Sequence, residues 1–331
     1  MTELVEHWQS RYDWRRCEEQ LNSLGQFRTA IDGLGIQFLH ARSPEPDALP
    51  LIITHGWPGS VVEMMQVIAP LTDPVRHGGS AADAFHVVVP SLPGYGFSEK
   101  PKSAGWNVPR IAAAWATLMG RLGYDRYVAQ GGDWGSMVTA TMGAAGGEHL
   151  AGIHLNMVVV RPDRQLELTA HEQAMFEDLA TYQRVGSGYM NQQSTRPQTL
   201  GYGLVDSPVG QAAWIAEKFW EWTDHGGDLN SILSFDQILD NVMHYWLPGT
   251  GASSARLYWE TAQARSFAVP TVPLGISVFP KEIFRATERL AARMFPSLTY
   301  FNEVEAGGHF AAFEQPALFV EEVRACFRSL R

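Results

Sequence analysis

Hydrophobic residues follow two spacings along the chain, one typical of buried strands and one typical of amphipathic helices. Short apolar runs rich in β-branched residues, which suit strands buried on both faces, occupy 35–42, 49–57, 85–90, 127–132 and 150–160. Helical spacing occupies 3–24, 61–71, 108–124 and 134–145. Because strands and helices alternate, we expect an α/β fold whose mostly parallel central sheet has helices on both faces.

The strand pattern stops near residue 160 and returns much later. Residues 161–262 show helical periodicity and irregular loops without a clear strand. The patterns that follow predict a strand, a helix, a strand with a loop, and a closing helix at 272–279, 281–295, 298–310 and 316–330. We therefore expect an N-terminal helical segment, a first core part, a helical cap inserted late in the core, and a second core part, at 1–32, 33–160, 161–262 and 263–331.

The composition is that of a globular protein and argues against several kinds of partner. Of the 331 residues, 45% are hydrophobic and 18% are charged, and the formal net charge is −10 without a basic run. This acidity argues against nucleic acid or an anionic membrane as a partner. Cys17 and Cys326 form no CxxC motif, and neither a signal peptide nor an apolar run of about eighteen residues is visible. We expect a cytoplasmic protein without a membrane anchor.

The stretch VAQGGDWGSMV at 128–138 has the outline of a nucleophile elbow, with Asp133 in the place of the nucleophile. A nucleophile on a tight turn between a strand and a helix needs small neighbours, and Gly131 and Gly135 are small. The alternative is that Asp133 only caps the following helix, which is a common role for aspartate. We favour the catalytic interpretation.

Two further motifs lie where a hydrolase built on this elbow needs them. THGWPGS at 54–60 follows a buried strand, the place from which a loop of the α/β-hydrolase fold lends a backbone N–H to an oxyanion hole. The residue after the nucleophile lends the other N–H, so we expect the amides of Trp57 and Trp134 to form the oxyanion hole. AGGHF at 306–310 carries His309, which follows the last expected strand, where the chain order nucleophile, acid, base requires the base.

The acid should follow the strand at 272–279, and Glu282 does so. Its rivals are Glu303 and Glu305, which lead into the histidine loop, and Glu282 itself could instead be a helix first-turn carboxylate. The sequence contains no HExxH, no complete GxGxxG and no Walker A motif. We therefore expect neither a metal site nor a nucleotide cofactor.

An aspartate nucleophile restricts the substrate. Attack on an acyl group would give an anhydride, whereas attack on a saturated carbon gives a stable alkyl ester. The substrate then carries a leaving group on an sp³ carbon, as an epoxide or an alkyl halide does. An opening epoxide needs a proton donor, for which tyrosine is suited. The expected cap offers five, and spacing does not select among Tyr182, Tyr189, Tyr202, Tyr245 and Tyr258.

Several motifs resemble one known family across nearly the whole chain. HGWPGS, LPGYGFS, GGDWGS, GYMNQQ, SSARLYWE, VPLGISVFPKEIF and GGHFAAFEQP are similar to those of the microsomal-type and juvenile-hormone epoxide hydrolases, including their bacterial relatives. The resemblance implies an α/β-hydrolase fold and no cofactor. Relative to that family the chain begins late, so the N-terminal segment is expected to be shortened and the membrane anchor of the mammalian members to be absent.

The same resemblance assigns roles to individual residues. It implies that Asp133 is the nucleophile, Glu282 the acid, His309 the base, and Tyr189 and Tyr258 the donors to the epoxide oxygen. The two tyrosines, with Trp57 and Trp134, would contact the substrate, a hydrophobic epoxide. A homodimer is one option for the assembly.

Two other functions stay open at this point. A haloalkane dehalogenase would use the same aspartate and the same tryptophan after it, although Trp57 stands where a halide-binding asparagine would follow HG. A catalytically silent protein that only binds its ligand could also use this fold. Both remain alternatives to epoxide hydrolysis.

Overall fold

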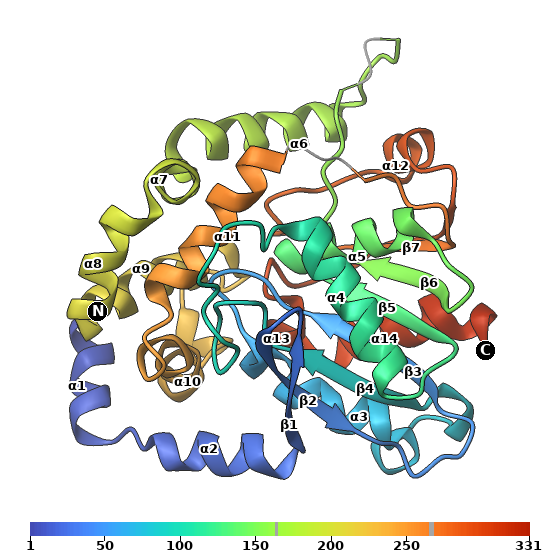
Figure 1. Ribbon diagram of the computed structural model, residues 1–331. Helices are drawn as coiled ribbons and strands as arrows, with labels where there is room; N and C mark the ends of the chain where they lie inside the picture. The colour runs from blue at the N-terminus through green and yellow to red at the C-terminus, as the bar shows by residue number, and fades with distance from the viewer. Residues whose placement is uncertain (163–164, 265–267) are drawn as a thin grey trace.

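An eight-stranded sheet forms the centre of the computed structural model, which describes residues 1–162, 165–264 and 268–331 (Figure 1). The strands are β1 (Gln26–Ile31), β2 (Leu34–Ala41), β3 (Leu49–Thr54), β4 (Phe85–Pro90), β5 (Tyr127–Gly131), β6 (Leu150–Leu155), β7 (Leu274–Val278) and β8 (Leu298–Glu303). Their order across the sheet is β1-β2-β4-β3-β5-β6-β7-β8. Residues 163–164 of the expected cap and 265–267 of the expected second core part lie outside the described residues.

The sheet is mostly parallel, as the sequence predicts. Strands β1, β2 and β4 pair antiparallel, and every pairing from β4 to β8 is parallel. The segment expected as helical at 1–32 also contains β1, which forms a hairpin with β2. Asp32 and Gly33 make the two-residue turn with φ of 50° and 75°, a left-handed conformation that suits a tight hairpin.

Helices cover both faces of the sheet. The helical elements of the core and N-terminal segment are α1 (Thr2–Ser10), α2 (Trp14–Ser23), η1 (Val61–Met64), α3 (Met65–Thr72), η2 (Pro74–His77), η3 (Ala81–Asp83), α4 (Val108–Arg121), α5 (Trp134–Ala145), α12 (Glu288–Met294), α13 (Ala311–Glu314), α14 (Pro316–Phe327) and η6 (Arg328–Leu330). Helices α4 and α5 pack together against one face, whereas α3 and α14 pack together on the other. Strands β3 to β7, between these helices, have nearly continuous buried runs, as strands covered on both faces do.

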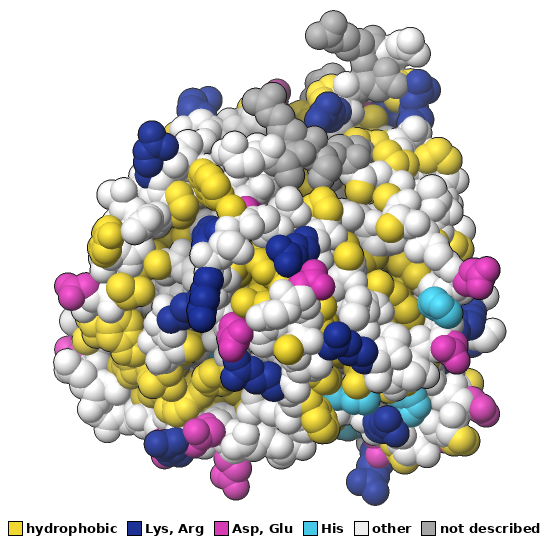
Figure 2. Space-filling view, in the orientation of Figure 1, with side chains coloured by type: hydrophobic (Ala, Val, Ile, Leu, Met, Phe, Trp, Pro, Cys, Tyr) yellow, Lys and Arg dark blue, Asp and Glu magenta, His cyan; other side chains and the backbone are white. Residues whose placement is uncertain are grey.

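The segment between β6 and β7 forms a helical cap. It contains α6 (Ala170–Thr181), the π-helical turn η4 (Tyr182–Gly186), α7 (Gly188–Thr195), α8 (Pro197–Asp206), α9 (Pro208–Trp222), η5 (Leu229–Ser231), α10 (Phe235–Trp246) and α11 (Gly251–Ala264). Its described residues contain no strand, as expected. Apolar side chains show on the surface of the cap and of the N-terminal helices, interspersed with charged ones (Figure 2).

The N-terminal segment forms hydrogen bonds with the cap, in addition to its contacts with the sheet. The guanidinium of Arg16 donates to both oxygens of Asp240 on α10, at 2.8 and 2.6 Å. The hydroxyl of Tyr12 donates to the same carboxylate at 2.8 Å. Because Asp240 is buried, these charge-assisted bonds compensate for its loss of water and hold the first two helices against the cap.

The helix expected at 281–295 is shorter than its pattern suggests. Only α12 (Glu288–Met294) is helical, and the residues after β7 form a loop. The Glu282 carboxylate accepts the backbone N–H of Ile283 at 2.7 Å and of Phe284 at 3.2 Å. These local bonds offer the backbone an alternative to the helix. Glu282 is therefore not a helix first-turn residue.

Candidate active site

Asp133 lies on a strained turn between β5 and α5, as the elbow motif predicts. Its backbone has φ 50° and ψ −125°, a conformation that residues other than glycine seldom adopt. A Cβ on Gly131 would lie 2.1 Å from the Gly135 carbonyl oxygen, and a Cβ on Gly135 would lie 1.8 Å from the Thr54 carbonyl oxygen. Glycine at both positions therefore lets the turn pack against the end of β3.

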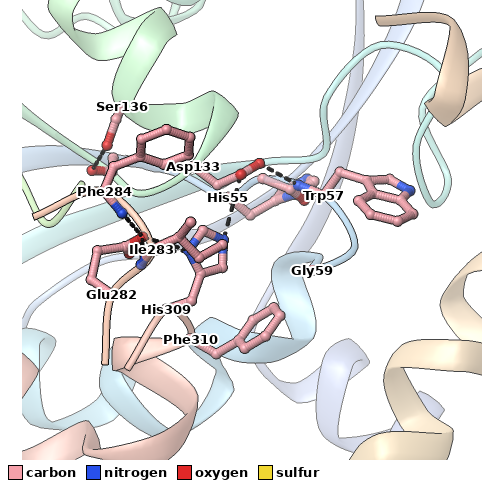
Figure 3. A network of polar contacts seen from close by, with 12 residues as sticks. His55, Trp57, Gly59, Asp133, Ser136, Glu282, Ile283, Phe284, His309 and Phe310 are labelled. Carbon is pink, nitrogen blue, oxygen red and sulfur yellow. Dashed lines mark hydrogen bonds and ion pairs between the residues drawn. The ribbon is translucent and has the colours of Figure 1, made fainter. Parts of the chain in front are cut away.

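The Asp133 side chain points toward the other motifs. It makes no helix-capping hydrogen bond, although the residue stands at the N-cap position of α5. The Trp57 amide donates to Asp133 Oδ1 at 2.7 Å, and His309 Nε2 lies 3.4 Å from Asp133 Oδ2 (Figure 3). The Trp134 amide belongs to the first residue of α5, where helix N–H groups have no partner within the helix. The capping alternative is therefore not what the side chain does.

Glu282 and His309 form a buried pair on neighbouring loops. His309 Nδ1 lies 3.0 Å from each Glu282 oxygen, and the two side chains are 2% and 1% exposed. The His309 amide donates to the Trp222 carbonyl oxygen at 2.9 Å, which ties this loop to the cap. Glu303 and Glu305 are exposed. The structure therefore brings Glu282, and neither rival, to His309.

The two carboxylates control the charge of the histidine. Burial disfavours the imidazolium, but the attraction of Glu282 and Asp133 outweighs it and holds the pKa of His309 well above its ordinary value. With Glu282 on Nδ1 and Asp133 on Nε2, each ring nitrogen faces a carboxylate. Removing the charge on Asp133 would therefore lower the pKa of His309.

Tyr189 and Tyr258 converge on the two tryptophans beside the aspartate. The Tyr189 ring, from α7, stacks on Trp57 with centroids 5.0 Å apart. The Tyr258 ring, from α11, meets Trp134 edge-on at 4.7 Å, and the two tyrosine rings are 5.9 Å apart. Burial raises the pKa of both phenols, so each keeps its proton at neutral pH and can donate it.

The other three tyrosines have different surroundings. Tyr202 is 67% exposed on α8. The Tyr245 hydroxyl donates to the Gly59 carbonyl oxygen at 2.6 Å, a buried bond that joins the cap to the loop after β3. Tyr182 shares a hydrogen bond of 2.8 Å with the Tyr189 hydroxyl. The structure thus places Tyr189 and Tyr258 at the site, Tyr182 beside them, and Tyr202 and Tyr245 elsewhere.

Two cap residues at the site were not singled out from the sequence. The Trp222 ring lies 5.1 Å from His309 and 5.2 Å from Tyr189, centroid to centroid. The Lys218 ammonium lies over the Tyr189 ring at 4.8 Å and the Trp222 ring at 5.6 Å. Both residues lie on one face of α9, one turn apart. Helical spacing in the sequence could have identified this shared face, but it does not distinguish residues that line a site from residues that only pack in the core.

A small cavity borders the Asp133 carboxylate. It has a volume of about 20 Å³, and its polar lining includes Glu63, Asp133, Asn156 and His309. This volume is enough for one water molecule. Glu63 was not singled out either, although SxxE at 60–63 is a capping-box pattern. The structure has that box, with Glu63 accepting the Ser60 amide at 2.9 Å.

Glu63→Gln should change how stability depends on pH. Burial raises the pKa of Glu63 from 4.5 to about 8, so the folded chain holds this proton more tightly than the unfolded chain. The free energy of unfolding of the wild type should therefore fall as pH rises from about 4.5 to about 8, by roughly 4 kcal/mol from this group. The glutamine variant lacks this contribution.

Urea unfolding at several pH values across that range measures the difference. Stability of the wild type relative to Glu63→Gln should decline steadily with pH. Glu19→Gln, at an exposed position of α2, is the matched control and should follow the wild type. A pH-independent difference between the wild type and Glu63→Gln would show that Glu63 ionises normally.

Neither a metal site nor a membrane span is found in the part of the chain that the structure describes. No group of three or more histidine, cysteine, aspartate or glutamate side chains there could hold a metal ion. Of the helices formed by described residues, none combines the length and the apolar character needed to cross a membrane.

Comparison with known proteins connects this geometry to a family. Residues 1–64 match the family model described as Epoxide hydrolase N terminus, and residues 50–205 match the one described as alpha/beta hydrolase fold. A protein of Stigmatella aurantiaca (strain DW4/3-1), named "Putative epoxide hydrolase", is 56% identical over 99% of this chain and 75% of its own. Epoxide hydrolase 1 of Sus scrofa is 37% identical over 98% of this chain and 78% of its own.

The comparison of structures agrees. The Aspergillus niger epoxide hydrolase superposes with a TM-score of 0.89 at 34% identity, covering 100% of this chain and 85% of that one. The juvenile hormone epoxide hydrolase of Bombyx mori gives a TM-score of 0.88 at 30% identity, covering 100% and 84%. These matches extend over the core and the cap together. The chain therefore belongs to the epoxide hydrolase family and has the α/β-hydrolase fold.

Proposed function

We propose that this enzyme adds water to a small-molecule epoxide and forms a vicinal diol through an ester on Asp133. The observation that carries the proposal is the joint placement of three groups. Asp133 faces both the Trp57 amide and the His309–Glu282 pair, while two buried phenols lie over the adjoining tryptophans. A nucleophile, a base with its carboxylate, and acids for the leaving oxygen are thus assembled in one place.

In the first step Asp133 opens the ring. Oδ1 is engaged by the Trp57 amide, which leaves Oδ2 to attack an epoxide carbon. A carbon–oxygen bond forms to Oδ2 as the ring carbon–oxygen bond breaks, and the released alkoxide takes a proton from Tyr189 or Tyr258. Without that proton the alkoxide is a poor leaving group, so the two phenols act as general acids.

In the second step His309 activates water. Once Asp133 is an ester, its negative charge is gone, and the pKa of His309 falls because one of the two carboxylates that raised it is neutral. The imidazolium then releases its proton to solvent, and the neutral imidazole can take a proton from a water molecule, for which the cavity beside Asp133 provides room. Water attacks the ester carbonyl carbon, and the oxyanion forms at Oδ1, which the Trp57 and Trp134 amides stabilise.

Glu282 supports the histidine through both steps. It accepts the Nδ1 hydrogen of His309, which fixes the ring orientation and stabilises the imidazolium that forms. Two backbone N–H groups, from Ile283 and Phe284, keep this carboxylate in place. When the acyl carbon–oxygen bond of the ester breaks, the proton left on the attacking water oxygen passes to the leaving oxygen, so the diol departs neutral and Asp133 regains its charge.

The walls of the site favour a hydrophobic epoxide. Trp57, Trp134, Trp222 and the two phenols present aromatic rings around the nucleophile. Buried phenols also favour an epoxide over an alkyl halide, because a departing halide needs no proton donor. A nucleophile, a base and acids that are all in place argue against a protein that only binds its ligand. Cytoplasmic action and a homodimeric assembly stay predictions from the sequence.

A single turnover in heavy-oxygen water tests the mechanism. With enzyme in excess over an aryl epoxide, water attacks the ester carbonyl, so one heavy oxygen should enter the Asp133 carboxylate. Mass spectrometry of the peptide containing 128–138 should find the label there, with the first diol unlabelled. Label confined to the diol would mean that water attacks the epoxide directly and would contradict the covalent route.

A further inference from the structure

A third phenol lies behind one of the two donors. The Tyr182 and Tyr189 hydroxyl oxygens are 2.8 Å apart, which is the usual length of a hydrogen bond between two hydroxyl groups. Tyr189 has one proton, and the proposed function uses it for the alkoxide. If Tyr182 donates to the Tyr189 oxygen, the Tyr189 proton is left free to point to the substrate.

The chain holds the Tyr182 ring in place by an unusual local structure. Tyr182 is the first residue of the π-helical turn η4, and such turns often occur at functional sites. A Cβ on Gly186 would lie 2.8 Å from Tyr182 Cδ2, so the absence of a side chain at 186 lets the ring lie where it does. Phe284 meets the same ring edge-on, with centroids 5.8 Å apart.

Tyr182 also borders an open depression that the donors do not line. This cavity, of about 320 Å³, is lined by Tyr182, Trp222, Lys281, Glu282 and Arg285 among others. Tyr189 is buried and does not contribute to it. Tyr182 is therefore the member of the pair that contacts both Tyr189 and a surface opening.

The surroundings make the outer phenol the easier one to ionise. Burial raises the pKa of Tyr182 to about 12, and it raises the pKa of the more deeply buried Tyr189 further. A negative charge shared by the pair is thus less costly on Tyr182 than on Tyr189.

We propose that Tyr182 is a positioning residue that orients Tyr189 and relays a proton to it during ring opening. The proposal rests on the proposed function. The Tyr189 proton passes to the alkoxide oxygen as the Tyr182 proton passes to the Tyr189 oxygen, so the phenolate is left on Tyr182. His309 releases its resting proton to solvent while Asp133 is an ester and keeps the proton that it takes from water, so it ends the cycle as the imidazolium it began as. Tyr182 regains its proton from solvent through its opening.

Rapid mixing with an aryl epoxide, followed by the fluorescence of the tryptophans around Asp133, separates ester formation from ester hydrolysis. Tyr182→Phe should slow ester formation by about three- to tenfold, the equivalent of one neutral hydrogen bond, and leave hydrolysis unchanged. In a Tyr189→Phe background the same change should have no effect, because the residue through which Tyr182 acts is gone. In mixtures of light and heavy water, the rate of ester formation should curve with deuterium content in the wild type and be linear in Tyr182→Phe.

A second pair of variants keeps both phenols. Gly186→Ala should displace the Tyr182 ring and reproduce the defect of Tyr182→Phe. Gly188→Ala is the matched control, because a Cβ there meets nothing within 4 Å, and it should behave as the wild type.

Equal slowing by Tyr182→Phe with and without Tyr189, or a linear wild-type deuterium response, would overturn the relay. A wild type that forms no ester would contradict the proposed function as well, whereas normal ester formation in both the wild type and Tyr182→Phe contradicts the relay alone.

Discussion

His309→Gln should lose turnover and accumulate an ester on Asp133. Ring opening needs the carboxylate and the phenols, none of which this variant changes. Hydrolysis needs a base, and glutamine cannot take the proton from water, so the second step should slow by about 10²- to 10⁴-fold. The variant should therefore open one epoxide per site and stop.

Intact mass spectrometry after mixing with an aryl epoxide measures the result. The protein mass should rise by the mass of one epoxide, and digestion should place the addition on the peptide that contains Asp133. Asp133→Ala combined with His309→Gln should show no addition, and His77→Gln, at an exposed position, should keep full turnover. If His309→Gln remains unmodified while it is folded, His309 acts before or during ring opening and the assigned order of steps is wrong.

Removing both donor hydroxyls should stop ester formation. Tyr189→Phe and Tyr258→Phe should each slow ring opening by about tenfold or more, and the double variant by about 10³-fold, because the alkoxide is then released without a proton. The Tyr189 ring keeps its stacking contact with Trp57, and the Tyr258 ring keeps its edge-on contact with Trp134, so the shape of the site is retained. Hydrolysis of an ester that has already formed should proceed at the wild-type rate, since it depends on His309.

The separation of the two steps is the decisive feature of this experiment. Tyr202→Phe, which removes an exposed cap hydroxyl, is the control and should leave both steps unchanged. A loss shared equally between ring opening and hydrolysis would indicate a general disturbance of the cap. Full activity of the double variant would mean that another group protonates the alkoxide.

Local sequence was enough for the parts of the site that a turn or a short loop creates. The elbow around Asp133 depends on glycines two residues away on either side, whose packing leaves no room for a side chain. The alternation of strands and helices could also be predicted from the sequence, because strands buried on both faces have continuous apolar runs. Strand β1 was missed, since its exposed, mixed side chains lack such a run.

Local sequence patterns did not reveal which distant segments contact one another. The sequence favoured Glu282 over Glu303 and Glu305 by its position after a strand, but only the packed loops show that Glu282 contacts His309 while the two rivals are exposed. Spacing in the sequence did not distinguish among the five cap tyrosines, and only the resemblance selected Tyr189 and Tyr258. The structure distinguishes these two by their contacts with Trp57 and Trp134, to which α7 and α11 bring them. Glu63 and Trp222 carried no pattern that distinguishes a site from a core.

The sequence by itself therefore predicted the candidate nucleophile and base, the order of the core elements and a helical cap, because each depends on residues close together in the chain. The tertiary structure decided which acid meets the base, which phenols face the nucleophile and that Tyr182 stands behind Tyr189. It also decided the charge of His309, since that depends on two carboxylates brought together from β5 and the loop after β7. Burial and proximity arise only when distant segments pack, and they set the pKa values on which the chemistry depends.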